Sequence, residues 1–471
     1  MIDLKKSRYV TWILIVIIAS ACATYYKKNI QFQERLAQGD IEKAEKILES
    51  DTKQAEGKNR LLYLLNRGYV SWLLHDHEES NGFLASADIM VEDYVKKLGT
   101  EILALAVNPA MKPYKPEDFE IVLINYFKAL NYIALNNLEA AYVEVRKINI
   151  KLNSLNDKYK KNKNRYDNDA FAHLVMGLIY EAQNDHNNAF IAYRNAYEVY
   201  KEDYGKNFGV SVPQQLKYDI LRTAYRTGFY EEVREYEKEF GIKHDPKNNP
   251  DSEMIFFWLN GLGPVKAEWS INFTIIPGGD GVFTFANEDL GINIPFNTNS
   301  LSKDEKAAFS DLKFIRIAFP KYVERKPIYT QAKIFTSSNG EYPLEVAQNI
   351  NEIAFKTLQD RMLRELANSL ARFAVKKAIE MAASKENQNL GAAVGILNAL
   401  TEKADTRNWQ TLPYSISYSR IPLKEGQNSV RLMTGNNGQL HEETVVNVEA
   451  KKGKTYFYTF HNLDSYPAPI Y

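Results

Sequence analysis

The hydrophobic period of this chain changes near residue 245, and that change constrains its fold more than any other feature. Over residues 29–245 apolar side chains recur every three to four positions, with Gly or Asn at the intervening turns. This spacing predicts helices joined by short turns. Beyond a break rich in Pro and Asn at 246–250, short strand-like runs replace the helical period. The sequence therefore predicts an α+β, multidomain chain with a helical domain at 29–245 and a strand-rich domain at 250–471.

The strand-rich domain is expected to be a β-sandwich-like unit. Its turns are rich in Gly and Asn, and Gly278 to Gly281 predicts a hairpin. One stretch, 343–400, returns to the helical period and is interpreted as a helical insert. The predicted strands are 269–276, 282–285, 314–319, 328–335, 414–420, 430–433, 444–448 and 455–460.

Residues 173–196 match the spacing of the tetratricopeptide repeat (TPR), a pair of packed helices. In this pattern Gly177 lets the two helices approach closely, and Ala189 leaves room where they cross. Weaker copies around Gly68 and Ala129 place the marker positions 61 and 48 residues apart, whereas a regular array repeats every ~34. We therefore expect an N-terminal α-solenoid of degenerate TPR-like hairpins. The signature residues are Met176, Gly177, Tyr180, Ala189, Tyr193 and Ala196.

The N-terminus has the three parts of a secretory signal. Three basic residues within positions 5–8 precede an apolar run at 9–18, and small residues then lead to Cys22. Residues 18–22 resemble a bacterial lipobox, in which the thiol takes a diacylglyceryl group and, after cleavage, an acyl chain. We predict a signal peptide at 1–21 and a lipid anchor and tether at 22–28. Cys22 is the only cysteine, so an internal disulfide is excluded.

The residues after Cys22 bear on location. Ala23 follows the cysteine where an inner-membrane retention signal would have Asp, which resembles an outer-membrane address. Surface-exposed lipoproteins often carry acidic residues there, whereas this chain has Lys27 and Lys28. The prediction is a lipid-anchored protein of the outer membrane that faces the periplasm.

Three segments resemble a family of bacterial outer-membrane-type lipoproteins with TPR-like helices. They are Phe119 to Arg146, Phe319 to Tyr322, and Ala404 to Pro413. The family has no established activity, so the resemblance implies architecture and location. Members are often encoded near small lipoproteins of cell-wall synthesis or secretion, which implies envelope proteins as partners.

Asp405, Arg407 and Trp409 lie where the predicted insert returns to strand. An Arg can pair with a carboxylate through two parallel hydrogen bonds, or stack on an indole. Two interpretations stay open: a structural latch that fastens the helical insert to the strands, or a partner-binding site.

The sequence holds few signals of chemistry. Its 59 basic and 59 acidic residues balance, which argues against a nucleic-acid partner. His75-Asp76-His77 is the only histidine cluster and lacks an evident third ligand, so no metal is predicted. With Cys22 committed to lipid, no thiol nucleophile remains, and neither a Gly-x-Ser-x-Gly elbow nor a Walker-type phosphate loop occurs. We expect no catalysis and no cofactor beyond the lipid on Cys22.

The leading functional hypothesis is a lipid-anchored periplasmic scaffold. Stacked helical hairpins form a concave surface suited to protein partners, here partners of an envelope assembly for secretion or the cell wall. The strand-rich domain is expected to fold even without residues 29–245. The alternative is a lipid-anchored protein that binds a glycan or another small ligand, for which the 30 tyrosines offer aromatic surface.

Overall fold

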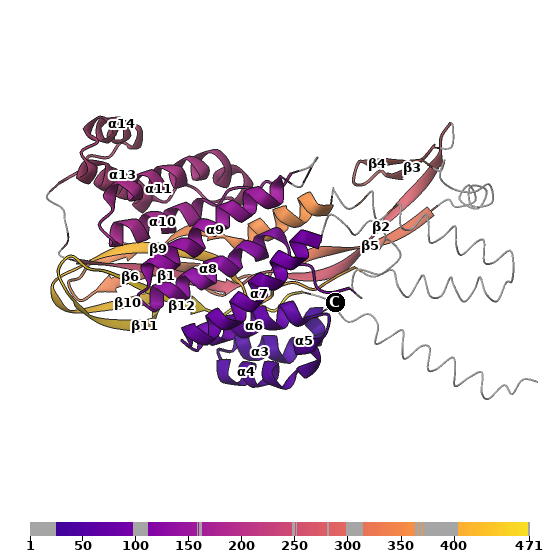
Figure 1. Ribbon diagram of the computed structural model, residues 1–471, viewed down its shortest axis with the longest axis horizontal. Coiled ribbons are helices and arrows are strands. Elements are labelled where there is room, and N and C mark those ends of the chain that lie inside the picture. The colour runs from indigo at the N-terminus through magenta and orange to yellow at the C-terminus, as the bar shows by residue number, and fades with distance from the viewer. Residues whose placement is uncertain are drawn as a thin grey trace, which may run out of the picture.

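In the computed structural model, a layer of helices lies along stacked strands, and a narrow arm of strands extends from one end (Figure 1). The structure describes residues 25–97, 112–157, 159, 163–246, 250, 252–279, 282–297, 314–362, 366, 370 and 404–469. The signal peptide, Cys22 and most of residues 363–400 of the predicted insert lie outside these ranges. Within them, no helix has both the length and the apolarity to cross a bilayer.

The first part of the chain forms TPR-like helical hairpins. In its described residues, the second part forms largely antiparallel sheets with a further helix, so the α+β class is confirmed. Successive helices pack as antiparallel pairs, such as α8 with α9 and α10 with α11. The helices are α2 Tyr25–Lys28, α3 Ile30–Ala37, α4 Ile41–Ser50, α5 Thr52–Glu56, α6 Arg60–Leu73, α7 His77–Lys97, α8 Asp118–Ala134, α9 Leu138–Asn156, α10 Ala170–Ala182, α11 His186–Val199, the π-helical turn η3 Tyr200–Tyr204, α12 Gly205–Phe208, α13 Gln214–Thr227 and α14 Tyr230–Phe240.

Five hairpins turn in the same way. Within two residues after the first helix, one residue takes a left-handed backbone conformation. The next N–H returns to a carbonyl five residues back, as from Asp185 to Tyr180 at 2.9 Å. Only Gly, Asn and one His occupy the left-handed position, since bulkier side chains clash there. The spacing of these turns varies from 36 to 61 residues, which explains why the repeat is weak in the sequence. The left-handed residues are Gly39, His75, Asn136, Asn184 and Gly228.

The strands form three four-stranded sheets. Their orders are β12-β1-β9-β8, β11-β10-β6-β7 and β4-β3-β2-β5. In the first sheet β1 pairs parallel with β12 and antiparallel with β9. The strands are β1 Ser252–Leu262, β2 Val265–Pro277, β3 Val282–Asn287, β4 Ile292–Asn297, β5 Phe314–Val323, β6 Gln331–Thr336, β7 Glu341–Pro343, β8 Glu345–Asn349, β9 Pro413–Leu423, β10 Gly426–Asn436, β11 Gln439–Ala450 and β12 Thr455–Asn462.

Strand β1 lies at the centre of a three-layered core. Its side chains alternate between the two faces of the first sheet. On one face Trp258 packs with Ile334 and Leu432 of the second sheet. On the other face Phe257 packs with the helices, its ring perpendicular to that of Phe171 on α10 at 5.9 Å. Helices, first sheet and second sheet therefore share continuous apolar packing.

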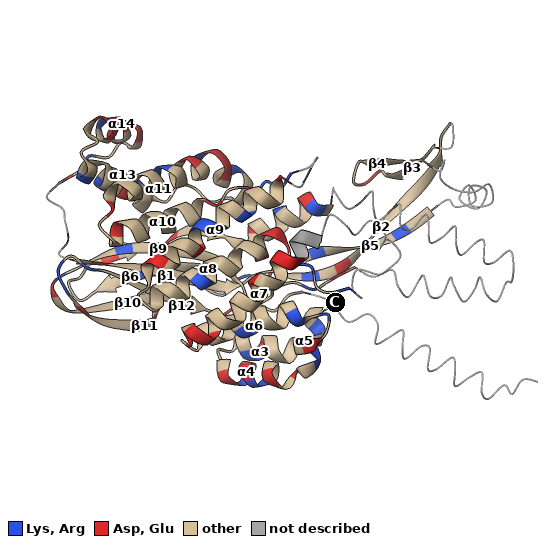
Figure 2. Ribbon diagram, in the orientation of Figure 1, with Lys and Arg blue, Asp and Glu red and all other residues tan. Residues whose placement is uncertain are grey.

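This packing fills most of the inner, concave side of the helical layer. In α8, 14 of the 17 residues are buried, because outer helices cover one side and the first sheet covers the other. The outer helix α14 buries only Val233 and mixes both signs of charge (Figure 2). The surface that a solenoid normally offers to a partner is thus largely occupied by the chain's own strands.

The arm consists of the third sheet. Strand β2 follows β1 after a two-residue break and pairs with β5 over ten residues, from Val265 with Val323 to Thr274 with Phe314. One face of the arm, including Ile271 and Phe273, is covered by Leu366 and Leu370, which follow the helix at 350–362.

The expected helical insert begins later than predicted. Residues 345–349 form β8 and pair with β9, and the helix starts at 350. Asn349 sets this start, because its Oδ1 accepts the N–H of Glu352 at 3.0 Å. Strand β1 was missing from the predicted strands. Its run from Met254 to Leu259 lacks polar alternation because both of its faces are buried.

Candidate functional site

The TPR signature residues pack α10 against α11. A Cβ added to Gly177 would lie 2.3 Å from the ring of Tyr193, so the two helices meet at this glycine. Ala189 and Ala196 are fully buried at the same crossing. Tyr193 also donates its hydroxyl to Glu181 at 3.0 Å.

The other two signature residues lie towards the preceding hairpin. Met176 and Tyr180 are partly buried, and the ring of Tyr180 lies 4.8 Å from that of Tyr142 on α9. All six signature residues therefore have packing roles within and between hairpins.

Arg407 joins the 404–412 segment to the helical layer. Its Nε and Nη2 donate to Asp405 at 2.8 and 2.6 Å, and its Nη1 donates to Asn59, just before α6, at 3.1 Å. Its guanidinium also lies over the ring of Tyr114, 5.6 Å from the centroid.

Trp409 reaches further into the same helices. Only 1% of it is exposed, and its rings lie within 6.4 Å of those of Tyr69 on α6 and Phe127 on α8. Its backbone N–H donates to Glu120 at 2.7 Å, and its indole N–H donates to Thr411 at 2.8 Å. These contacts fasten the strands to α6 and α8, and the buried indole offers no surface to a partner.

The predicted tether is shorter than expected. Residues 25–28 form α2, and Tyr25 and Tyr26 are buried. The N–H of Tyr25 donates to Thr406 Oγ1 at 3.1 Å, and its hydroxyl donates to Gln54 at 3.1 Å. Tyr25, three residues after Cys22 in the sequence, is thus packed beside the segment that carries Arg407 and Trp409.

A groove of about 700 Å³ remains where the N-terminal hairpins approach the edge of the first sheet. Its volume is in the range of protein ligand sites. The helical wall is largely apolar and includes Leu73 of α6 with Leu130 and Ile133 of α8. His75 and His77 also line this side. Strand β12 forms the opposite wall, with Phe457 and Thr459 among its lining residues.

Among the described residues, strand β12 is an open edge of the first sheet. It pairs with β1 on one side, where the N–H of Glu253 donates to the carbonyl of Lys454 at 3.2 Å. In a parallel ladder, alternate residues direct their backbone groups to the neighbouring strand. The even-numbered residues of β12 therefore face β1, whereas Phe457 and Thr459 direct their N–H and C=O groups outward, into the groove.

The opposite edge of the same sheet is covered. The hydroxyl of Tyr200 in η3 donates to the carbonyl of Ala347 on β8 at 2.7 Å. The carboxylate of Glu345 accepts the N–H groups of Gln214 and Gln215 at the start of α13, at 3.0 and 2.9 Å. Edge strands are normally protected. Within the described residues no strand covers the outer edge of β12, which faces the groove, so this edge is a candidate binding surface.

The groove has an acidic side. Glu443 and Asp464 line it beside the second sheet, and none of its lining residues is Lys or Arg. Glu443 accepts the hydroxyl of Thr434 at 2.8 Å and lies 3.4 Å from His441. Burial raises the pKa of the Asp464 carboxyl above its usual value.

His461 closes the inner end of the groove as a structural residue. Its Nε2 lies 2.7 Å from the carbonyl of Gly261 and must donate to it, so Nδ1 accepts the hydroxyl of Tyr69 at 2.6 Å. Burial lowers the pKa of His461 to about 4, which keeps it neutral at neutral pH. No group of three His, Cys, Asp or Glu that could hold a metal is found among the described residues. The groove provides backbone hydrogen bonds, apolar surface and negative charge.

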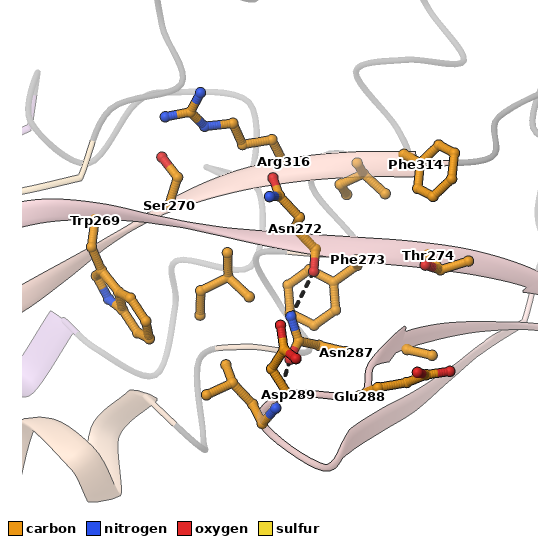
Figure 3. A pocket seen from close by; sticks show the side chains of 14 residues that line it. Trp269, Ser270, Asn272, Phe273, Thr274, Asn287, Glu288, Asp289, Phe314 and Arg316 are labelled. Atoms are coloured by element: carbon orange, nitrogen blue, oxygen red, sulfur yellow. Dashed lines mark hydrogen bonds between the residues drawn. The ribbon is translucent and has the colours of Figure 1, made fainter.

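A second cavity of about 810 Å³ lies in the arm, between β2 and the turn from β3 to β4 (Figure 3). Trp269 and Phe273 lie on the side of β2 that faces this turn, and Arg316 extends from the opposite side. Asn287 closes the cavity's end by donating to the carbonyl of Asn272 at 2.7 Å. The indole N–H of Trp269 is buried without a hydrogen-bond partner.

The sequence did not reveal the groove. The run at 455–460 predicted a strand, and β12 is found there, but its place at a sheet edge depends on pairing with β1, about 200 residues earlier. A period-two pattern identifies a strand without identifying its neighbours.

No family model and no curated protein matches the sequence. Among solved structures, the chain is similar to MamA at 15% identity, covering 44% of this chain and 90% of that one, with a TM-score of 0.28. The apo form of RapI is 13% identical, and the match covers 46% of this chain and 52% of that one, with a TM-score of 0.33. BtubC (BKLC) from P. vanneervenii is 11% identical, and the match covers 52% of this chain and 91% of that one, with a TM-score of 0.32. Such likeness concerns the fold alone, so a function must be argued from the residues of this chain.

Proposed function

We propose that this chain is a lipid-anchored, non-catalytic protein of the bacterial envelope that binds a polypeptide partner in the groove beside β12. The observation that carries the proposal is an open strand edge that faces an apolar helical wall. Adding a strand to such an edge is a recurrent mode of peptide recognition: main-chain hydrogen bonds give affinity and side-chain pockets give specificity. The binding surface is thus the remaining groove rather than the concave side as a whole.

The position of Tyr25 supports an anchor at Cys22. Only Ala23 and Thr24 separate Cys22 from the first buried residue. Three residue steps span at most about 10 Å, so a lipid on Cys22 would hold the body close to the bilayer. The anchor would confine the groove near the membrane and raise the local concentration of other envelope proteins.

The anchor is tested by Cys22→Ser, with Ala23→Ser as the matched control. Cells are fed an alkyne fatty acid, fractionated, and the label on the protein is read. We expect the wild type and Ala23→Ser to be labelled and to sediment with outer membranes, and Cys22→Ser to lose the label. A label that persists in Cys22→Ser would exclude this anchor.

The groove is tested by Thr459→Pro against Thr459→Val. Proline is tolerated at an edge strand where its missing N–H would point outward, so Thr459→Pro blocks the edge while the β12–β1 ladder remains. Thr459→Val keeps the N–H and the branched shape. After crosslinking in intact cells, we expect a partner that co-purifies with wild type and Thr459→Val to be lost from Thr459→Pro. Equal recovery from both variants would refute the groove as the binding site.

The cavity in the arm favours a second candidate function, the binding of a glycan or another small polar ligand. The specific observation is a cavity whose lining combines the ring of Trp269, with its buried and unpartnered indole N–H, and polar side chains such as Asn287 and Asp289. Calorimetry with oligosaccharides tests this candidate. Binding that weakens in Trp269→Phe, which keeps a ring but removes the donor, would support it, and no heat from the wild type would dismiss it.

A further inference from the structure

The two sides of the β12 groove differ in chemistry, and this difference indicates what it accepts. We infer that the occupant is an extended polypeptide segment whose side chains alternate between apolar and basic, added as a strand along β12. The inference rests on the proposed function and deepens it by naming the class of partner.

The backbone of β12 sets the geometry. Its outward N–H and C=O groups recur at every second residue, at Thr455, Phe457 and Thr459. These groups repeat at about 6.6 Å along the strand, and a paired strand would lie about 4.8 Å away. A segment in this position must be extended, because a helix satisfies its own backbone groups.

One row of the incoming side chains would meet the helices. In β12, Phe457 packs against the core cluster that α6 and α8 help to form. Side chains on the same face of an added strand would point towards Trp72, Leu130 and Ile133, all within the groove lining. This wall is apolar, so burying apolar side chains there is favourable, by about 25 cal/mol per Å² of buried apolar surface.

The other row would meet the acidic side. Tyr458 and Phe460 pack between the first and second sheets, so the next side chains on that face would approach Glu443 and Asp464. No Lys or Arg is among the lining residues, and the helical side of the groove adds only His75 and His77. The two carboxylates on the other side therefore favour a basic side chain over an acidic one. Electrostatic complementarity of this kind gives specificity and speeds association.

The probes are synthetic peptides with blocked ends. Each has about eight residues, to match the eight residue pairs between β12 and β1. The first peptide alternates Val and Lys, and the second alternates Val and Glu. The third has the sequence of the first with one Val near its middle replaced by Pro. Binding to the full chain in detergent is measured by fluorescence anisotropy at low and at physiological salt.

We expect the Val–Lys peptide to bind at least ten times more tightly than the other two. Thr459→Pro should weaken it about tenfold or more, and Thr459→Val should leave it unchanged. Glu443→Gln should weaken it about threefold to tenfold at low salt, less as salt screens the charge. Hydrogen exchange gives an independent readout: the amides of Phe457 and Thr459 should become protected, whereas side-chain docking alone would leave them unprotected.

The outcomes separate the inference from the proposed function. In one outcome, the Val–Lys and Val–Glu peptides bind equally well, or neither binds, while Thr459→Pro still abolishes partner capture in cells. The groove then binds a partner, but the inference that this partner carries basic side chains is wrong. If the Val–Lys peptide binds without protecting Phe457 and Thr459, strand addition is refuted. If Thr459→Pro alters neither peptide binding nor capture, both proposals fail.

Discussion

Arg420 on β9 forms a buried ion pair with Glu181 of α10, with 2.8 Å between Nη2 and the carboxylate oxygen. Asp219 and Arg222 of α13 complete a network of ion pairs that joins two helices, α10 and α13, to the first sheet. Burial alone would raise the pKa of Glu181, yet the guanidinium groups of Arg222 and Arg420 hold it well below its usual value. The helices and the sheet are therefore joined by charge as well as by apolar packing.

Removing the Arg420 side chain should strongly lower the free energy of unfolding. Arg420→Met leaves Glu181 and Asp219 buried with less positive charge, which typically costs about 3–5 kcal/mol. The matched control is Arg431→Met on β10, whose partner Glu442 is 4.0 Å away and where both side chains are about half exposed. That change should cost less than about 1 kcal/mol. Urea unfolding of both variants measures the two costs, and similar losses would contradict a structural role for the buried pair.

His461 should make stability depend on pH. Its folded pKa of about 4 lies below the ordinary value of 6.5, so between these values the unfolded chain binds more protons. Stability is therefore fully present above pH 6.5 and declines as pH falls towards 4. From pH 7 to pH 5 the loss from this group is about 2 kcal/mol.

The measurement compares unfolding free energies at pH 7 and pH 5 in wild type and His461→Gln. Gln supplies a donor for Gly261 but does not titrate. From pH 7 to pH 5 the unfolding free energy of His461→Gln should therefore fall by about 2 kcal/mol less than that of the wild type. His75→Asn, at an exposed turn whose left-handed backbone suits Asn, is the control and should keep the pH dependence of the wild type. An identical pH dependence in wild type and His461→Gln would show that His461 is not the group responsible.

Local features of this fold could be predicted, and long-range ones could not. Gly177 and Tyr193 lie 16 residues apart, and their helix packing follows a local spacing that the sequence displays. The pairing of β12 with β1 and the contact of Trp409 with Tyr69 join residues hundreds of positions apart. Such neighbours depend on how several cores pack together, so the groove could not be read from either part alone.

The strand-rich part should not fold alone, contrary to the expectation from sequence. Without the helices, one face of the first sheet would expose Ile255, Phe257, Ile416 and Tyr418, which are fully buried in the chain. An apolar face of this kind promotes aggregation. Residues 250–471 expressed alone should be insoluble or lack cooperative unfolding, and co-expression with residues 22–249 should restore a soluble complex. A monomeric fragment with a cooperative transition would show that the two parts are independent.

The helix crossing at Gly177 can be tested with two glycines that differ in surroundings. In Gly177→Ala the new Cβ would lie 2.3 Å from the ring of Tyr193, which is buried and hydrogen-bonded to Glu181 and cannot easily move. Overpacking of this kind costs about 1–3 kcal/mol. Gly82 lies on the exposed side of α7 with nothing within 4 Å of its added Cβ, so Gly82→Ala should stabilise the chain by roughly 0.5–1 kcal/mol through helix propensity. In thermal unfolding, Tm should therefore fall for Gly177→Ala and rise for Gly82→Ala. A matching rise in Tm for Gly177→Ala would mean that the hairpin does not depend on a glycine at its crossing.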